Sequence, residues 1–143
     1  MPLVRKVSES EARESIKRYA VGVEYDGSRF HGWQSQLGVT TVQDLLEGAL
    51  SSVAAAPIRV ITAGRTDTGV HASGQVAHFD TLAERTALNW VRGANTNLPE
   101  GLAVTWANEV DNRFHARFSA LSRKYRYILF CRDVRPTYLA QRV

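Results

Sequence analysis

Residues 18–25 read Arg-Tyr-Ala-Val-Gly-Val-Glu-Tyr, and residues 40–53 read Thr-Thr-Val-Gln-Asp-Leu-Leu-Glu-Gly-Ala-Leu-Ser-Ser-Val. In the first stretch the apolar side chains from Val21 to Tyr25 alternate, which predicts a half-buried strand. In the second stretch apolar residues recur every three or four positions, which predicts a helix with one buried face. Thr40 with Gln43 fits a capping box at the start of that helix.

Further elements are predicted on both sides of this pair. Strand-like runs cover 58–63, 75–80, 102–110 and 122–131, and a second helix is expected over 84–95. This order predicts an α+β fold, with a largely antiparallel sheet, two helices on one face and the other face free for a ligand. We expect residues 18–135 to form the domain and residues 1–17 to be a flexible tail or a short solvated helix.

Composition excludes several classes of protein. The 143 residues suffice for one domain, and 44% hydrophobic with 22% charged residues excludes general disorder. No apolar run approaches the roughly 20 residues that span a bilayer, and the N-terminus lacks a secretory signal. Cys131 is the one cysteine, which excludes an internal disulfide and a cysteine-based zinc site. We therefore expect a cytoplasmic protein that is not bound to a membrane.

Positive charge is concentrated at the C-terminal end. Residues 113–143 contain eight basic side chains and one acidic side chain, whereas residues 1–112 carry a net charge of −3. Arginine outnumbers lysine 15 to 3, and guanidinium groups can grip phosphates and stack on bases. The pattern indicates RNA or DNA as a partner. A solvated arginine-rich surface is the alternative.

Residues 64–74 form a glycine-punctuated loop that contains Arg65, Asp67 and His71. A carboxylate near an arginine stays ionised and can act as a nucleophile or a base. Equally, an aspartate in Thr-Asp-Thr-Gly can simply bond its own backbone in an Asx-turn. His71 and His78 have no third ligand at metal-like spacing, so we expect two hydrogen-bonded structural histidines and no metal.

The run 122–131 combines cations with aromatic rings. A two-residue period places Arg123 and Tyr125 on one face and Lys124 and Arg126 on the other. Such neighbours suit base stacking and phosphate contact, although tyrosines packed in a core would give the same pattern. The chain lacks a Walker A loop, a dinucleotide fingerprint and a Gly-x-Ser-x-Gly element, which disfavours ATP, NAD and serine hydrolysis.

Six motifs in order give the sequence a specific resemblance. The central one runs from Ala63 to Ala72 as Ala-Gly-Arg-Thr-Asp-Thr-Gly-Val-His-Ala. The others lie at 23–34, 41–43, 74–79, 95–99 and 114–127. From about Tyr19 to Arg135 the chain resembles the TruA-type tRNA pseudouridine synthases. Thr68 departs from the usual alanine of that family and is small enough to be tolerated.

The resemblance implies a fold, a reaction and roles for residues. The fold would be the RRM/ferredoxin-like half of the pseudouridine synthase fold, and the reaction would convert uridine to pseudouridine in the anticodon stem-loop of tRNA without cofactor or metal. Asp67 would be the catalytic carboxylate, Tyr125 would stack on the target base, and Arg65 would hold the nucleotide or the carboxylate. Further RNA contacts would come from Arg29, His31, Arg117, Arg123, Lys124 and Arg126.

One departure from the family concerns length. Members of the family are about twice as long, so we expect this chain to be an N-terminal fragment in which 136–143 begin the connection to a missing half. The fragment alone would be inactive, and the full-length parent would be a homodimer. Two other functions remain open: a non-catalytic RNA-binding module, and a glycosidic-bond hydrolase in which Asp80 or Glu84 partners Asp67.

Overall fold

The computed structural model describes residues 8–142. Its elements are α1 (Glu9–Ser15), β1 (Lys17–Tyr25), the 3-10 turn η1 (Gly27–Arg29), α2 (Val42–Ala54), β2 (Ile61–Thr62), β3 (Ala72–Thr81), α3 (Ala87–Thr96) and β4 (Leu102–Val110). Of the residues expected to form a tail, 1–7 lie outside the described part, and α1 is a short helix capped by Ser8.

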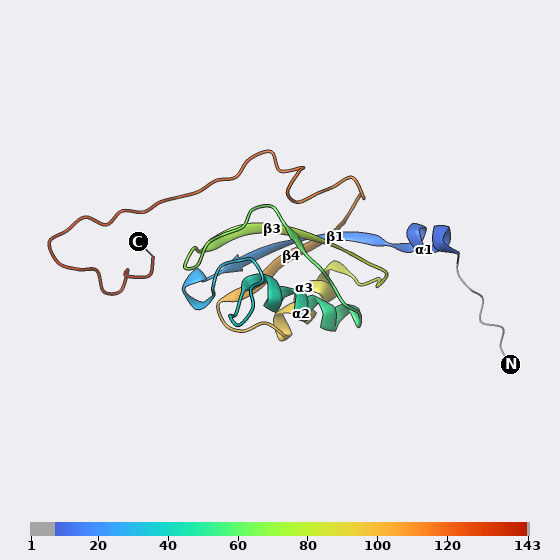
Figure 1. Cartoon of the computed structure of the whole chain (residues 1–143), viewed down its shortest axis with the longest axis horizontal. Helices are drawn as coiled ribbons and strands as arrows, with labels where there is room; N and C mark the ends of the chain where they lie inside the picture. Colours follow the sequence, from blue (N-terminus) through green and yellow to red (C-terminus); the bar gives the residue numbers. More distant parts are fainter. Residues whose placement is uncertain (1–7, 143) are drawn as a thin grey trace.

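The sheet has the strand order β2-β3-β1-β4, and every neighbouring pair is antiparallel. In its middle, Val21 lies between Ala77 of β3 and Ala107 of β4. The helices α2 and α3 cover one face of the sheet (Figure 1). The predicted α+β architecture with two helices on one face of an antiparallel sheet is confirmed.

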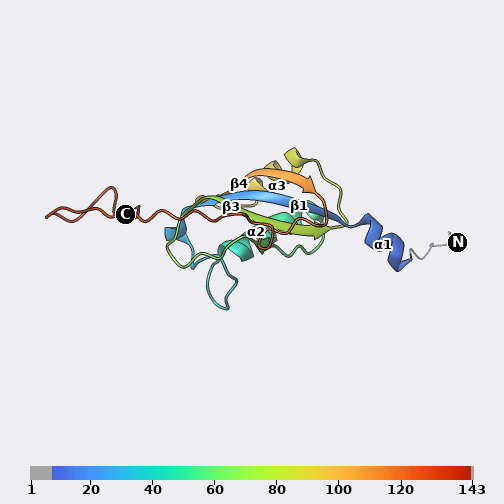
Figure 2. The same cartoon turned by 90° about the horizontal axis from the view of Figure 1, so that it is seen from above.

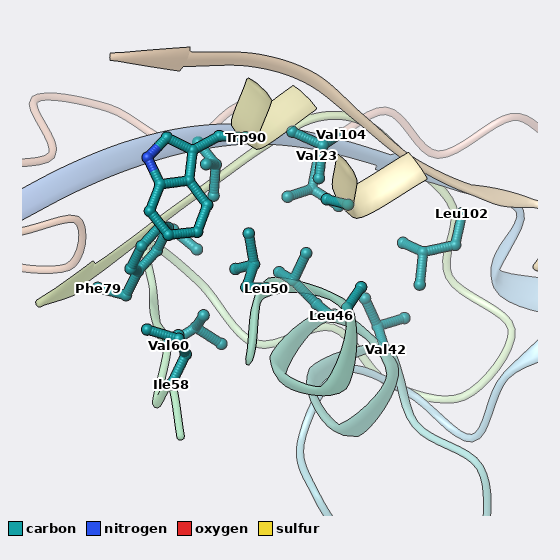
Figure 3. Close-up of a cluster of buried hydrophobic side chains, with 14 of the residues drawn as sticks. Val23, Val42, Leu46, Leu50, Ile58, Val60, Phe79, Trp90, Leu102 and Val104 are labelled. Carbon is teal, nitrogen blue, oxygen red and sulfur yellow. The ribbon is translucent and has the colours of Figure 1, made fainter. Parts of the chain in front are cut away.

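The core lies between the sheet and these two helices. Val21, Val23 and Tyr25 belong to the core as predicted, but Ala20 and Gly22 between them are buried as well, so the prediction of a half-buried strand is wrong. Leu46 and Leu50 of α2 meet them, as the helical periodicity predicted (Figure 3). Burial of these apolar side chains is the main force that fixes the sheet against the helices.

Two further local predictions are wrong. The N-cap of α2 is Thr41, whose hydroxyl accepts a hydrogen bond from the amide of Asp44. The helix therefore begins one residue later than the predicted capping box of Thr40 and Gln43. The strand expected over 122–131 does not form: this basic segment is exposed and irregular. Alternating side chains favour a strand, but a strand also needs a neighbouring backbone. Within residues 8–142 the backbone of 120–136 makes no hydrogen bond to another backbone group.

The chain after β4 crosses the face of the sheet that the helices leave open (Figures 1 and 2). Its first part is fixed there, because Arg18 donates to the carbonyl oxygens of Asn112 and Phe114. The amide of Ala116 then donates to His78 Nδ1 on β3 at 3.0 Å. These contacts carry the chain from the β4 edge towards β2, and the basic segment (residues 122–131) follows.

Candidate active site

The loop of Asp67 leaves the sheet at the edge strand β2. The amide of Ala63 extends the pairing of β2 with β3 by donating to the Val76 carbonyl oxygen at 2.8 Å. Four residues later the Asp67 carbonyl oxygen accepts the amide of Val70 at 3.1 Å, and Gly69 in that turn has a φ of +85°. Residues other than glycine are strained at such a φ. The turn leaves Asp67 exposed at the edge of the sheet.

The Asx-turn alternative does not explain this loop. Within the described residues the Asp67 carboxylate makes no hydrogen bond to the surrounding backbone. The turn is closed by main-chain atoms instead, so the carboxylate is left for solvent or a ligand.

The loop after β1 holds the Asp67 loop in place. The amide of Trp33 donates to the Thr66 carbonyl oxygen at 3.0 Å, and the Thr66 hydroxyl lies 2.7 Å from the Tyr25 hydroxyl. Gly32 permits this approach, since a Cβ at that position would lie 2.8 Å from the Thr66 carbonyl oxygen. Asp67 is thus positioned through its neighbour Thr66 rather than through its own side chain.

His71 and His78 are both hydrogen-bonded within the fold, as the sequence predicted. His71 Nδ1 accepts the amide of Gly27 at 3.0 Å and lies 3.2 Å from an Asp26 carboxylate oxygen. The hydroxyl and amide of Ser28 donate to the same carboxylate and hold the pKa of Asp26 below its usual range. His71 therefore links the two interlocking loops and does not face the pocket described below.

Gln75 is a site residue that the sequence analysis missed. Its Nε2 donates to the Gly64 carbonyl oxygen at 2.6 Å and to the Tyr25 hydroxyl at 3.3 Å. It lies opposite Val23 in the sheet and therefore on the helix side. A polar residue at an apolar position of a strand was the available signal, because a buried polar group needs a partner. Here that partner is the start of the Asp67 loop.

A surface pocket of about 480 Å³ lies where the basic segment passes this loop. Its charged lining residues are Arg65, Arg117 and Arg123, and the Tyr125 ring forms part of the wall beside Gly64. Tyr125 is 70% exposed, so its ring is free to stack on a ligand. Guanidinium groups next to an aromatic ring suit a nucleotide, whose phosphate and base need these two kinds of contact.

The pocket gathers some of the predicted residues and not others. Arg65, Tyr125, Arg117 and Arg123 line it; Asp67 does not, and lies exposed two residues after Arg65. The remaining candidate RNA contacts are exposed outside the pocket: Lys124 and Arg126 on the basic segment, and Arg29 and His31 on the loop after β1. Of these, the Arg29 guanidinium lies 3.7 Å from a Glu100 carboxylate oxygen.

The arrangement disfavours a two-carboxylate hydrolase. Asp80 is bound by Arg18, with oxygen–nitrogen distances of 2.7 and 2.9 Å, and Glu84 lies 3.4 Å from Lys17 Nζ. Arg18 and Lys17 lie at the start of β1, whereas the Asp67 loop packs at the Tyr25 end of that strand. At 3.3 Å per residue the two ends are roughly 23 Å apart. Neither acid can reach the 5–10 Å separation that a glycosidase requires.

Comparison with known proteins shows the family of the chain. The sequence model described as tRNA pseudouridine synthase matches residues 22–119, a range that contains Arg65, Asp67 and Arg117. The chain belongs to the tRNA pseudouridine synthase family. Tyr125 lies just beyond the matched range.

Similar curated proteins carry the same family name. The chain is 52% identical over 142 residues to tRNA pseudouridine synthase A of Pseudomonas aeruginosa, an alignment that covers 99% of this chain and 50% of the relative. It is 59% identical over 126 residues to the Nitrosococcus oceani protein of that name, covering 88% of this chain and 49% of the relative. The chain thus spans about half the length of the curated relatives it matches.

Residues 8–142 hold neither a metal-binding cluster of side chains nor a membrane-spanning helix. No group of three or more histidine, cysteine, aspartate or glutamate side chains is arranged to hold a metal ion there. In the same range no helix has the length and apolar character needed to cross a membrane.

Proposed function

We propose that this chain carries the catalytic acid and the nucleotide-binding pocket of a tRNA pseudouridine synthase, which isomerises uridine to pseudouridine in the anticodon stem-loop. The observation that carries the proposal is the pocket in which Arg65, Arg117 and Arg123 meet Tyr125, next to the exposed Asp67. Family membership supports the reaction class. The full protein would act on tRNA in the cytoplasm, as a homodimer and without a cofactor.

The reaction needs an ionised carboxylate at the nucleotide. It breaks the C1′–N1 glycosidic bond, turns the freed uracil and joins C5 to C1′. Asp67 serves by attacking C1′, by attacking C6 or by taking a proton from the sugar, and all three routes require an exposed carboxylate. Its exposure and its lack of hydrogen bonds within the described loop support this role.

The target uridine must leave its stack to reach the pocket. Tyr125 would receive the everted base on its ring, and Arg65 would hold the nucleotide's phosphate or orient Asp67. Lys124, Arg126, Arg29 and His31 would contact the surrounding backbone of the RNA. In this proposal residues 18–135 act as one unit, with the N-terminal residues outside the site.

The test uses a chimera, because the chain spans half of its relatives. This chain replaces the matching segment of the Pseudomonas aeruginosa relative, and tritium release from C5-labelled uridine in tRNA is measured. Asp67→Asn removes the ionisable carboxylate and is expected to lower kcat by at least about 10³-fold while tRNA binding persists. Asp133→Asn is the matched control, since Asp133 is also an exposed aspartate.

Two results would overturn the proposal. A chimera that folds and binds tRNA but releases no tritium would lack the activity altogether. Full activity in the Asp67→Asn chimera would instead favour the non-catalytic RNA-binding module, because the acid would then be dispensable. The 143 residues alone are assayed in parallel, with no turnover expected.

A further inference from the structure

We propose that Arg123 is a positioning residue, which ties the basic segment to the start of the Asp67 loop and thereby fixes Tyr125 relative to the acid. This inference rests on the proposed function and deepens it. From the sequence, Arg123 was a candidate phosphate contact like its neighbours. Its contacts in the structure give it a different task.

The guanidinium of Arg123 bridges two loops of the site. Its Nε donates to the Ala63 carbonyl oxygen at 2.8 Å, and its Nη2 donates to the Arg117 carbonyl oxygen at 3.0 Å. Within residues 8–142 these are the hydrogen bonds that join residues 120–136 to the rest of the domain. Further along, Gln141 contacts the domain again through Ser28 and His71, so Arg123 is the tie nearest to the pocket.

The bridge also places the ring of Tyr125. A Cβ added to Gly64 would lie 3.4 Å from Arg123 Cδ, from Arg123 Nε and from the Tyr125 hydroxyl oxygen. Both side chains consequently pack against the same backbone position. If the bridge to Ala63 is lost, the hydroxyl of Tyr125 loses the contact that sets its distance from the loop.

The loop is held from its other side as well. Gln75 binds the Gly64 carbonyl oxygen from the sheet, while Arg123 binds the preceding carbonyl oxygen from the basic segment. Consecutive peptide groups are thus fixed by two donors on different elements. Arg65 and Asp67 follow directly, so this clamp sets the geometry between the acid and the stacking ring.

Arginine is required for such a bridge. Its planar fork presents several donors in fixed directions, whereas the ammonium of lysine is a single compact charge on a flexible stem. Arg123→Lys therefore keeps the positive charge and removes the two-carbonyl geometry. Arg132→Lys is a matched control: Arg132 lies on the same stretch of chain and donates through Nε and Nη2 to the carbonyl oxygens of Val134 and Arg135, within its own segment.

The first measurement is kinetic and uses the chimera. Arg123→Lys is expected to lower kcat by roughly 10- to 100-fold with KM changed less than about 3-fold, because misplacement of reacting groups slows the chemical step. Arg132→Lys is expected to leave both constants unchanged. A rise in KM at constant kcat in Arg123→Lys would identify a phosphate contact and overturn the proposal.

The second measurement needs no activity and uses the 143-residue chain. Amide hydrogen exchange of Ala63, whose amide donates to the Val76 carbonyl oxygen, is expected to become several-fold faster in Arg123→Lys and to stay unchanged in Arg132→Lys, because removal of the bridge frees the start of the loop. Unchanged exchange in Arg123→Lys would overturn the inference. If the chimera is inactive but the exchange result is as expected, the proposed function is refuted and the positioning role of Arg123 stands.

Discussion

Gly32 lies where two loops of the site touch. It has a φ of +76°, and an added Cβ would lie 2.8 Å from the Thr66 carbonyl oxygen, next to Asp67. Gly38 has a φ of +79° but faces open space. A comparison of the two glycines therefore separates the effect of a positive φ from the effect of close packing. Of the two, Gly32 is the one that contacts the Asp67 loop.

We expect Gly32→Ala to lower the free energy of unfolding by about 2–4 kcal/mol, from strain at positive φ and from a displaced Thr66. Gly38→Ala carries the strain alone and should cost about 1 kcal/mol. Urea unfolding of the two variants of the 143-residue chain measures the difference. Equal losses would contradict a role for the close approach.

At the scale of elements, strand β3 anchors the chain that crosses the open face. The imidazole of His78 is buried and accepts the amide of Ala116 through Nδ1, so it is neutral in the fold. Burial, followed by the positive charges of Arg18 and His115, lowers the pKa of His78 to about 4 from 6.5, with Asp80 opposing the shift.

This shift makes stability depend on pH. Between pH 6.5 and about 4 the unfolded chain binds a proton at His78 and the folded chain does not, so stability is present above pH 6.5 and falls as the pH is lowered through that window. The loss attributable to His78 is at most about 3 kcal/mol. His78→Asn keeps an acceptor for Ala116 without the titration, and its unfolding free energy should fall less between pH 7 and 4. Identical pH profiles would contradict the assignment.

Elements with a self-contained pattern could be predicted from the sequence. The periodicity of α2 and the alternation of β1 identify side chains of the core, although Ala20 and Gly22 of β1 are buried as well, and β4 was predicted with its observed bounds. The basic segment shows where this reasoning ends. Its alternation resembles that of a strand, but no backbone within residues 8–142 pairs with it, and a sequence pattern does not specify the partner.

Part of the site could be predicted from the sequence, and part depends on contacts that only the fold creates. Arg65, Asp67 and Tyr125 were selected through the resemblance to a family, and the structure places Arg65 and Tyr125 in one pocket. The clamp of Gln75 and Arg123 was not predicted, because it consists of side chains bound to main-chain oxygens. Any sequence offers such oxygens at every position, so only the fold selects Gly64 and Ala63.

For the whole molecule, charge and topology act together. Residues 113–143 carry eight basic side chains against one acidic, and the described part of this segment crosses the face that the helices leave open before it runs past the end of the sheet (Figures 1 and 2). The pocket lies at the β2 edge of the sheet, between the start of α2 and the basic segment. A polyanion attracted to the basic segment would therefore lie beside the pocket.

Binding of tRNA by the chimera should weaken steeply with salt. If Arg117, Lys124 and Arg126 each neutralise a phosphate, log Kd should rise with log[KCl] at a slope of about 2–3. Filter binding with the Asp67→Asn chimera measures it without turnover. Arg126→Gln is expected to reduce the slope by about 1, and Arg123→Lys to leave it unchanged. A slope near zero would contradict phosphate contacts by this surface.

The interlocking of the loops around Gly32 and Thr66 has a consequence for the order of folding. These residues are 34 positions apart in the sequence, and contacts between distant positions are made only after the intervening chain has been closed. We therefore expect the Asp67 loop to reach its position only after β1, α2 and β3 have assembled. A short peptide with the same glycine-rich motif would lack these distant contacts, and we expect it not to reproduce the surface around Asp67.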